Sequence, residues 1–136
     1  MTRGRHENVE ILSSRVLLRP SDYQRSMNFY RDSIGLAIAR EYGAGTVFFA
    51  GQSLIEIAGH GGSAEPGAPF PGALWLQVRD IYATEAELAG RGVPIAREAR
   101  QEPWGLQEMQ VTDPDGVTLI FVQIPDDHPL RRDTRG

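Results

Sequence analysis

The sequence predicts an α+β fold built from two copies of one βαβββ unit, with eight strands and two main helices. The first observation is a repeat: G-L-A-I-A-R-E at 35–41 returns 57 positions later as G-V-P-I-A-R-E at 92–98, with five of seven residues identical. The second is an apolar run that ends in aspartate, at 16–22 and again at 74–80, about one helix upstream of each copy. A long-period repeat with only two copies argues against a solenoid. The two units must therefore bury their faces against each other, and we expect a cavity between them.

The size and composition of the chain fit one domain with one core. A chain of 136 residues buries roughly 68–70% of its unfolded surface. The absence of cysteine excludes disulfides, zinc–thiolate sites and thiol nucleophiles. The formal charge of 14 minus 18, or −4, does not favour nucleic-acid binding. No apolar run approaches the length of a membrane span, and residues 1–10 lack the apolar core of a signal peptide. We expect a soluble cytoplasmic protein without a nucleic-acid or membrane partner.

The predicted boundaries place one domain between two loosely held ends. In chain order we expect a disordered or loosely packed N-terminus at 1–10, a first module at 11–58, a linker at 59–72, a second module at 73–124 and a solvated tail at 125–136. The linker is rich in Gly, Ala and Pro and has no periodicity. A long loop inside a compact domain is often functional, so this one could also line or cover the cavity.

The first module reads as a strand, a helix and three more strands. Residues 11–19 are strand-like, and Ser21 or Asp22 can cap the following helix. Four side chains at spacings of four, three and four share one face of that helix: Tyr23, Met27, Tyr30 and Ile34. Gly35 stands where a left-handed C-terminal cap is needed. The further strands are expected at 36–41, 46–50 and 53–58.

The second module repeats the order. A strand is expected at 73–79, and the next helix begins either at Asp80 or at a capping box formed by Thr84 and Glu87. Gly90 and Gly92 end that helix. The remaining strands are expected at 95–98, 106–112 and 117–124, with D-P-D-G at 113–116 forming the last turn.

Alternation along each strand divides the side chains into two faces. We assign these apolar positions to the helix-covered face: Val16, Leu18, Ile55, Ile57, Leu74, Leu76, Val78, Met109, Val111, Leu119 and Phe121. The cavity face then carries Arg15, Leu17, Arg19, Leu54, Glu56, Ala58, Ala73, Trp75, Gln77, Glu108, Gln110, Thr118, Ile120 and Val122. This mixture of apolar and polar groups is usual in small-molecule sites. The alternative is an amphipathic sheet with a wet outer face; Trp75 argues against it, because large aromatic side chains are seldom left in water without a use.

Two motifs resemble one known superfamily. Asp22 followed by S-M-N-F-Y at 26–30 and I-G-L at 34–36 resembles the "D…RS…FY…lGL" signature of the vicinal oxygen chelate superfamily, and D-P-D-G-V-T-L at 113–119 resembles its closing motif. This superfamily includes glyoxalase I, extradiol dioxygenases, fosfomycin-modifying enzymes, epimerases and bleomycin-resistance proteins. The resemblance implies two βαβββ modules forming a U-shaped, eight-stranded mixed sheet around a cup, with the helices on the outer face. It also implies a homodimer.

The resemblance places the four metal-holding positions of the superfamily's enzymes on Arg15, Glu56, Ala73 and Ile120. Only Glu56 can ligate a metal in the ordinary way, because a guanidinium has no lone pair and alanine and isoleucine have no donor atom. A catalytic divalent site needs about three protein ligands. We therefore expect no cofactor, with a divalent metal as the alternative. His60 could join Glu56 if its strand extends that far, whereas His6 and His128 fall in the expected tails.

The same alignment suggests an ion pair between Arg15 and Glu56 inside the cup. One reading is that the pair, or Arg15 alone, orients a polar or anionic part of a ligand, because arginine suits bidentate recognition of carboxylates. The other is a structural salt bridge that fills the position of the lost metal. A buried pair is better evidence for specificity than for stability.

The segment P-W-G-L-Q-E at 103–108 is similar to the Trp-Gly segment of bleomycin-resistance-like proteins. Those relatives lack metal ligands and bind a flat, cationic drug between aromatic residues, usually at a dimer interface, and an indole face suits such stacking. Trp104 is alternatively a packing residue at the rim. Further aromatic side chains could extend the wall: Tyr42, Phe48, Phe49 and Phe70. The expected ligand contacts are Arg15, Leu17, Glu56, Trp75, Gln77, Trp104, Glu108 and Gln110.

The leading functional hypothesis is a metal-free protein that binds and sequesters an aromatic or cationic metabolite or antibiotic. The second is a glyoxalase- or dioxygenase-like lyase, isomerase or oxygenase that uses Glu56 in a degenerate or non-standard metal site, or as a general base if desolvation raised its pKa. The third is a binding or accessory module whose cup is vestigial. The sequence does not name the ligand.

Overall fold

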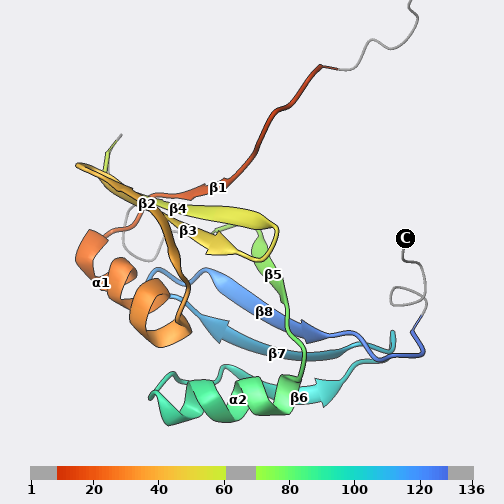
Figure 1. Cartoon of the computed structure of the whole chain (residues 1–136). Helices are drawn as coiled ribbons and strands as arrows, with labels where there is room; N and C mark the ends of the chain where they lie inside the picture. Colours follow the sequence, from red (N-terminus) through yellow and green to blue (C-terminus); the bar gives the residue numbers. More distant parts are fainter. Residues whose placement is uncertain (1–8, 61–69, 129–136) are drawn as a thin grey trace, which may run out of the picture.

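The computed structural model describes residues 9–60 and 70–128, and its elements are labelled in Figure 1. Residues 1–8, 61–69 and 129–136 lie outside the described part of the chain. Most of the expected N-terminal segment 1–10, linker 59–72 and tail 125–136 therefore cannot be compared with the structure.

Two βαβββ modules follow each other, as the repeat predicts. The first contains β1 (Val16–Leu18), α1 (Tyr23–Asn28), η1 (Phe29–Ile34), β2 (Ile38–Tyr42), β3 (Gly45–Ala50) and β4 (Ser53–Ala58). The second contains β5 (Ala73–Gln77), α2 (Ile81–Gly90), β6 (Arg97–Gln101), β7 (Gln107–Thr112) and β8 (Thr118–Gln123). The α+β class is confirmed. The eight strands are hydrogen-bonded as two four-stranded mixed sheets, in the orders β1-β4-β3-β2 and β5-β8-β7-β6, rather than as one continuous sheet.

The first strand is shorter than the predicted 11–19, and the register gives the reason. Strand β1 runs parallel to β4 with Val16 opposite Ile55, and β4 begins at Ser53. The chain upstream of Ser14 therefore passes beyond the end of its neighbour and has no ladder to join. Figure 1 shows this red segment extending away from the sheets.

Both helices are capped by aspartate. Asp22 accepts a hydrogen bond from the Arg25 amide, and Asp80 accepts from the amides of Tyr82 and Ala83. The capping-box start at Thr84 and Glu87 is therefore wrong, because the earlier carboxylate already satisfies the first free amides of α2.

The first helix widens into a π-helix after Asn28, which the sequence pattern did not indicate. The amides of Gly35 and Leu36 both donate to the Tyr30 carbonyl, at 3.2 and 3.0 Å, and Gly35 adopts the predicted left-handed conformation with φ 87°. In the part of the chain that the structure describes, no helix is long and apolar enough to cross a membrane.

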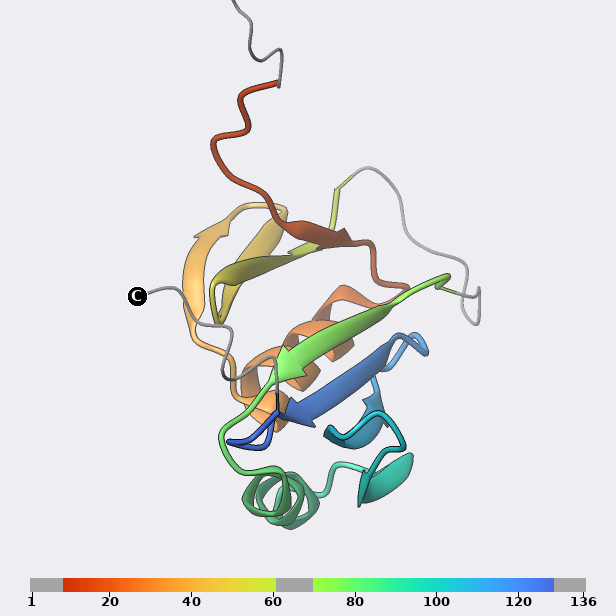
Figure 2. The same cartoon turned by 90° about the vertical axis from the view of Figure 1, so that its right-hand side faces the viewer.

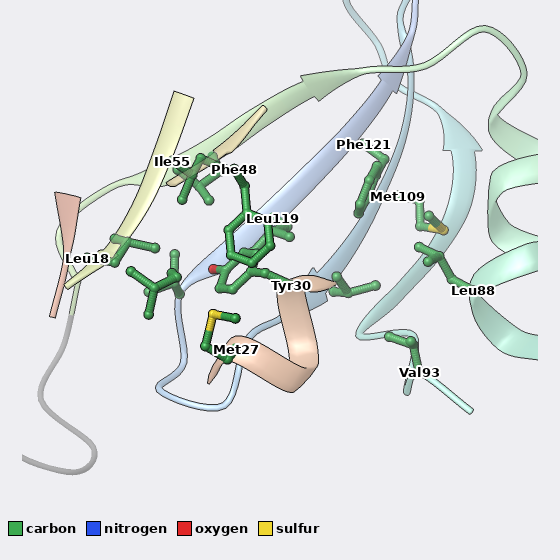
Figure 3. Packing of buried hydrophobic residues seen from close by; sticks show 14 of the residues in the cluster. Leu18, Met27, Tyr30, Phe48, Ile55, Leu88, Val93, Met109, Leu119 and Phe121 are labelled. Atoms are coloured by element: carbon green, nitrogen blue, oxygen red, sulfur yellow. The ribbon is translucent and has the colours of Figure 1, made fainter. Parts of the chain in front are cut away.

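The helix-facing sides of the two sheets share one core, part of which Figure 3 shows. Every position assigned to the helix-covered face is buried in this cluster or packs against it. Tyr30 lies at its centre and is fully buried, with its ring 6.3 Å from that of Phe48. Helix α1 lies beneath the first sheet and α2 beneath the second (Figures 1 and 2), so the opposite faces of the sheets point away from the core.

A buried hydrogen bond joins the two modules. The Tyr30 hydroxyl donates to Asp113 Oδ2 at 2.8 Å, while Asp113 Oδ1 accepts from the amides of Asp115 and Val117. Burial and the Asp113 carboxylate both raise the pKa of Tyr30, so the phenol stays protonated. The last turn of the second module is thereby fixed to the helix of the first.

Tyr30→Phe is expected to lower the free energy of unfolding by about 1–3 kcal/mol, because a buried carboxylate loses a donor while the ring packing is kept. Urea denaturation measures the change. Tyr82→Phe is the control, since Tyr82 is exposed on α2. Equal stability of the two variants would show that the bond to Asp113 contributes nothing.

Candidate functional site

The expected ion pair between Arg15 and Glu56 is present on the first sheet. It lies on the face that points away from the helices, which we call the inner face of each sheet. Arg15 Nη1 donates to Glu56 Oε1 at 3.0 Å. Glu56 is buried at 6% exposure, whereas the Arg15 side chain is 34% exposed. Leu17 and Val47 flank Glu56 on the neighbouring strands. A buried carboxylate without such a partner would be strongly unfavourable.

Two further side chains complete the environment of Glu56. The Tyr42 hydroxyl donates to Glu56 Oε2, and His60 Nε2 lies 3.1 Å from that hydroxyl and 3.6 Å from Oε2. Strand β4 ends at Ala58, so His60 does not extend the strand but still reaches the carboxylate from the loop. Sequence reasoning considered Tyr42 only for an aromatic wall and His60 only as a metal ligand.

Gly45 allows Tyr42 to reach Glu56 across β3. A Cβ at this position would overlap the Tyr42 hydroxyl and lie 2.9 Å from the Ile57 carbonyl oxygen. Gly45 is paired with Tyr42 on one side and with Ala58 on the other. A glycine at the first position of a strand was the available sequence signal for this close approach of the Tyr42 ring.

The electrostatics of this cluster keep Glu56 ionised. The hydrogen bond from Tyr42 is the largest cause that lowers the pKa of Glu56, followed by the bonds from Arg15 and His60; burial opposes them. The same bond to Glu56 raises the pKa of Tyr42. The Arg40 guanidinium lies 5.1 Å from the centre of the Tyr42 ring. Arg15 thus bonds the carboxylate directly, whereas Arg40 packs on the ring of the tyrosine that bonds it.

The inner face of the second sheet carries the other predicted contacts in two rows. Trp75, Ile120 and Gln110 are aligned across β5, β8 and β7. The next row on the same face joins Gln77 and Glu108 through Val122, which is fully buried. Trp75 remains 49% exposed, whereas Glu108 in the next row is buried.

Trp104 lies in the turn between β6 and β7. Its indole Nε1 donates to Glu108 Oε2 at 2.8 Å, although 59% of the residue is exposed. Gly105, with φ 96°, takes the left-handed position that this turn requires. The indole therefore has a fixed orientation and offers a free face, as a stacking platform needs.

The eight predicted ligand contacts lie on two different sheets. Arg15, Leu17 and Glu56 belong to the first sheet. The other five belong to the second: Trp75, Gln77, Trp104, Glu108 and Gln110. Within residues 9–60 and 70–128, no hydrogen bond or ion pair links the two groups. That all eight contact one ligand stays a prediction.

Two cavities lie where the modules meet. A smaller one, of about 240 Å³, is lined by Leu17 among the predicted contacts. A larger open groove, of about 790 Å³, is lined by Trp75 and Gln77. The ion pair and Glu108 lie outside both.

The sequence model of the Glyoxalase/Bleomycin resistance protein/Dioxygenase superfamily matches residues 13–121. The chain belongs to this superfamily. The match confirms the resemblance drawn from the two motifs and does not single out the bleomycin-resistance branch.

Two proteins with similar sequences are both named after one enzyme, lactoylglutathione lyase. The chain is 32% identical over 120 residues to lactoylglutathione lyase of Haemophilus influenzae, covering 79% of this chain and 88% of that protein. It is 29% identical over 120 residues to a probable lactoylglutathione lyase of Synechocystis sp., covering 79% and 91%.

Solved structures share the superfamily fold. A glyoxalase/bleomycin resistance protein/dioxygenase from Nocardioides has a TM-score of 0.73 at 14% identity, covering 96% of this chain and 93% of that one. Lactoylglutathione lyase from Agrobacterium tumefaciens has a TM-score of 0.62 at 16% identity, with coverage of 86% and 96%. Identities this low show the fold alone.

The four superfamily metal positions do not fit a divalent cation in this chain. Arg15 has no lone pair and already donates to Glu56, while Ala73 and Ile120 offer no donor atom. Among the described residues, no three His, Asp or Glu side chains converge as a metal site would require. A single carboxylate held by a guanidinium is left.

Tyr42→Phe is expected to raise the pKa of Glu56, because it removes the bond that lowers that pKa most. A lowered pKa in the folded state contributes stability above the ordinary value of 4.5, which is lost as the pH falls through the lowered pKa. Tyr42→Phe should shrink this acid-sensitive part of the stability. Carboxyl ¹³C NMR titration measures the pKa, with Tyr82→Phe as the control. A titration identical in both variants would contradict the assignment.

Proposed function

We propose that this protein is a metal-free member of the superfamily that binds and sequesters an aromatic or cationic small molecule in the cytoplasm. The observation that carries the proposal is the bond from Arg15 to Glu56 at 3.0 Å. It places a permanent cation at one of the positions where the superfamily's enzymes hold a metal. The protein then supplies the positive charge itself, and a ligand need not bring or displace an ion.

The second sheet supplies the recognition of an aromatic or cationic group. Trp104 is anchored to Glu108, and Trp75 stands half-exposed on the same face. Indole faces attract cations and stack on flat rings, and a buried carboxylate adds to the attraction of a cation. Gln77 and Gln110 beside them offer both donors and acceptors.

A lyase, isomerase or oxygenase is the second candidate, because sequence relatives carry the name lactoylglutathione lyase. The charge state of Glu56 argues against this residue as its general base. An effective base has a pKa near the working pH, and the partners of Glu56 hold its pKa below the ordinary value. Catalysis would then need another group, or a metal held by a different set of ligands.

We further propose a homodimer. Three large apolar side chains on or beside the inner faces remain exposed: Leu17 at 39%, Trp75 at 49% and Trp104 at 59%. Aromatic side chains are enriched in the buried centres of interfaces. A second copy would bring the first-sheet group of one chain toward the second-sheet group of the other.

Ligand binding is tested by fluorescence, because Trp75 and Trp104 are the two tryptophans of the chain. The probes are bleomycin, tryptamine and phenyltrimethylammonium, each titrated with EDTA present. At least one of them is expected to change the tryptophan emission in a saturable way. Trp104→Ala should weaken that probe by roughly 2–30-fold, equivalent to about 0.5–2 kcal/mol of cation–π energy. Trp104→Phe, which keeps a ring, should weaken it less.

Three results would contradict sequestration. They are the absence of saturable binding by all three probes, binding that disappears with EDTA and returns with Ni²⁺ or Zn²⁺, and steady turnover of lactoylglutathione when either metal is added. The last two would favour the enzymatic candidate.

The dimer is expected to sediment at twice the chain mass, and Trp75→Arg should shift it toward the monomer, because a charge would enter the centre of the interface. Tyr82→Arg is the control, since Tyr82 is exposed on α2. A wild-type protein that sediments as a monomer at micromolar concentration would refute the proposal.

A further inference from the structure

The smaller cavity lies between the modules, where β1 ends and β5 is about to begin. Figure 2 shows the last residues of β1 and the first residues of β5 on the same side of the molecule. The lining comes from both modules and is mainly apolar: Leu17, Leu18, Pro20, Ile57, Phe70 and Val117. Its volume of about 240 Å³ is just below the range of about 300–1,000 Å³ that holds drug-sized ligands. A small, largely apolar ligand therefore fits it.

One polar atom in this lining lacks a partner. Ser26 is 2% exposed, and its hydroxyl makes no hydrogen bond in the structure. A serine inside a helix often donates back to the carbonyl four residues earlier. Here the Asp22 carbonyl accepts only the Ser26 amide, at 3.1 Å. A buried hydroxyl without a partner is unfavourable, so Ser26 marks a position where a ligand group would supply the missing bond.

The charged groups of the lining differ in how far they are already satisfied. Asp113 accepts three hydrogen bonds, from Tyr30 and from two amides. Asp115 accepts from both the amide and the hydroxyl of Ser21. Arg19, by contrast, is exposed at the cavity and takes part in no ion pair or hydrogen bond with the described residues. The unpaired groups are the Arg19 guanidinium, which can only donate, and the Ser26 hydroxyl, which can donate or accept. A ligand group that accepts hydrogen bonds suits both.

We propose that this cavity binds a small monocarboxylic acid. The carboxylate would pair with the Arg19 guanidinium, the apolar body would lie among Leu18, Ile57 and Val117, and Ser26 would bond a carboxylate or carbonyl oxygen. Arginine suits this role because its planar fork matches a carboxylate. The inference does not rest on the proposed sequestering function, since the cavity shares only Leu17 with the eight predicted contacts.

Benzoate and hexanoate are the probes, each titrated into the full chain at millimolar concentration. Binding is followed by amide ¹H–¹⁵N NMR. We expect saturable shifts at the amides of Leu18, Ser26 and Val117, and none of comparable size at Gln77 or Glu108. Benzylamine, which has a similar body and the opposite charge, should cause no saturable shift at these amides.

Variants separate a built site from general charge attraction. Arg19→Gln should lower the affinity for benzoate by roughly tenfold and Ser26→Ala by roughly threefold, as expected for the loss of one charged and one neutral hydrogen bond. Arg79→Gln is the charge-matched control, because Arg79 is exposed and lines the other groove; it should bind benzoate as the wild type does. Both test variants should fold, since the side chains they replace have no partner in the described structure.

The proposal is overturned if neither acid shifts these amides, or if benzylamine binds as tightly as benzoate. It is also overturned if Arg79→Gln weakens binding as much as Arg19→Gln does. Probe shifts at the Trp104 indole report on the sequestering site separately, so either proposal can fail without the other.

Discussion

The burial of one carboxylate is the constraint on which the cluster at the first sheet depends. Glu56 lies on the inner face of a sheet at 6% exposure, where an ionised group without partners would be strongly unfavourable. Arg15, Tyr42 and His60 approach its two oxygens, and Gly45 leaves the space through which the Tyr42 ring passes. At the position that the superfamily resemblance assigns to a metal ligand, the carboxylate is held by protein groups that also lower its pKa.

The two inner faces differ in the side chains that they present. The first presents the Arg15–Glu56 ion pair and Tyr42, whereas the second presents two partly exposed indoles, one of them bonded to Glu108. Between the modules, the cavity at Arg19 and Ser26 offers unused donors in apolar surroundings. A superfamily fold of this kind hosts unrelated activities on one scaffold, so the separate chemistry of each region carries more information than the fold itself.

The shared core explains why these regions are separate. Tyr30 bonds to Asp113 across the modules, and the helix-facing residues of both sheets pack into one cluster. The inner face of the second sheet carries a separate buried cluster of Leu106, Val122 and Ile124. Neither of the two cavities between the modules is lined by inner-face strand residues of both sheets.

The sequence by itself determined the order of the elements, the two faces of each strand and the ion pair of Arg15 with Glu56, because these follow from local periodicity and from a motif register that is counted along the chain. It missed the π-helical turn, the Tyr42 crossing at Gly45 and the unpartnered hydroxyl of Ser26. The π-helical turn involves residues close in sequence, but the Tyr42 bond to Glu56 and the burial of Ser26 near Ile57 and Val117 depend on how close residues distant in sequence come to each other. Only the tertiary structure decided that, because packing of the two modules on one core, rather than any local preference, sets those distances.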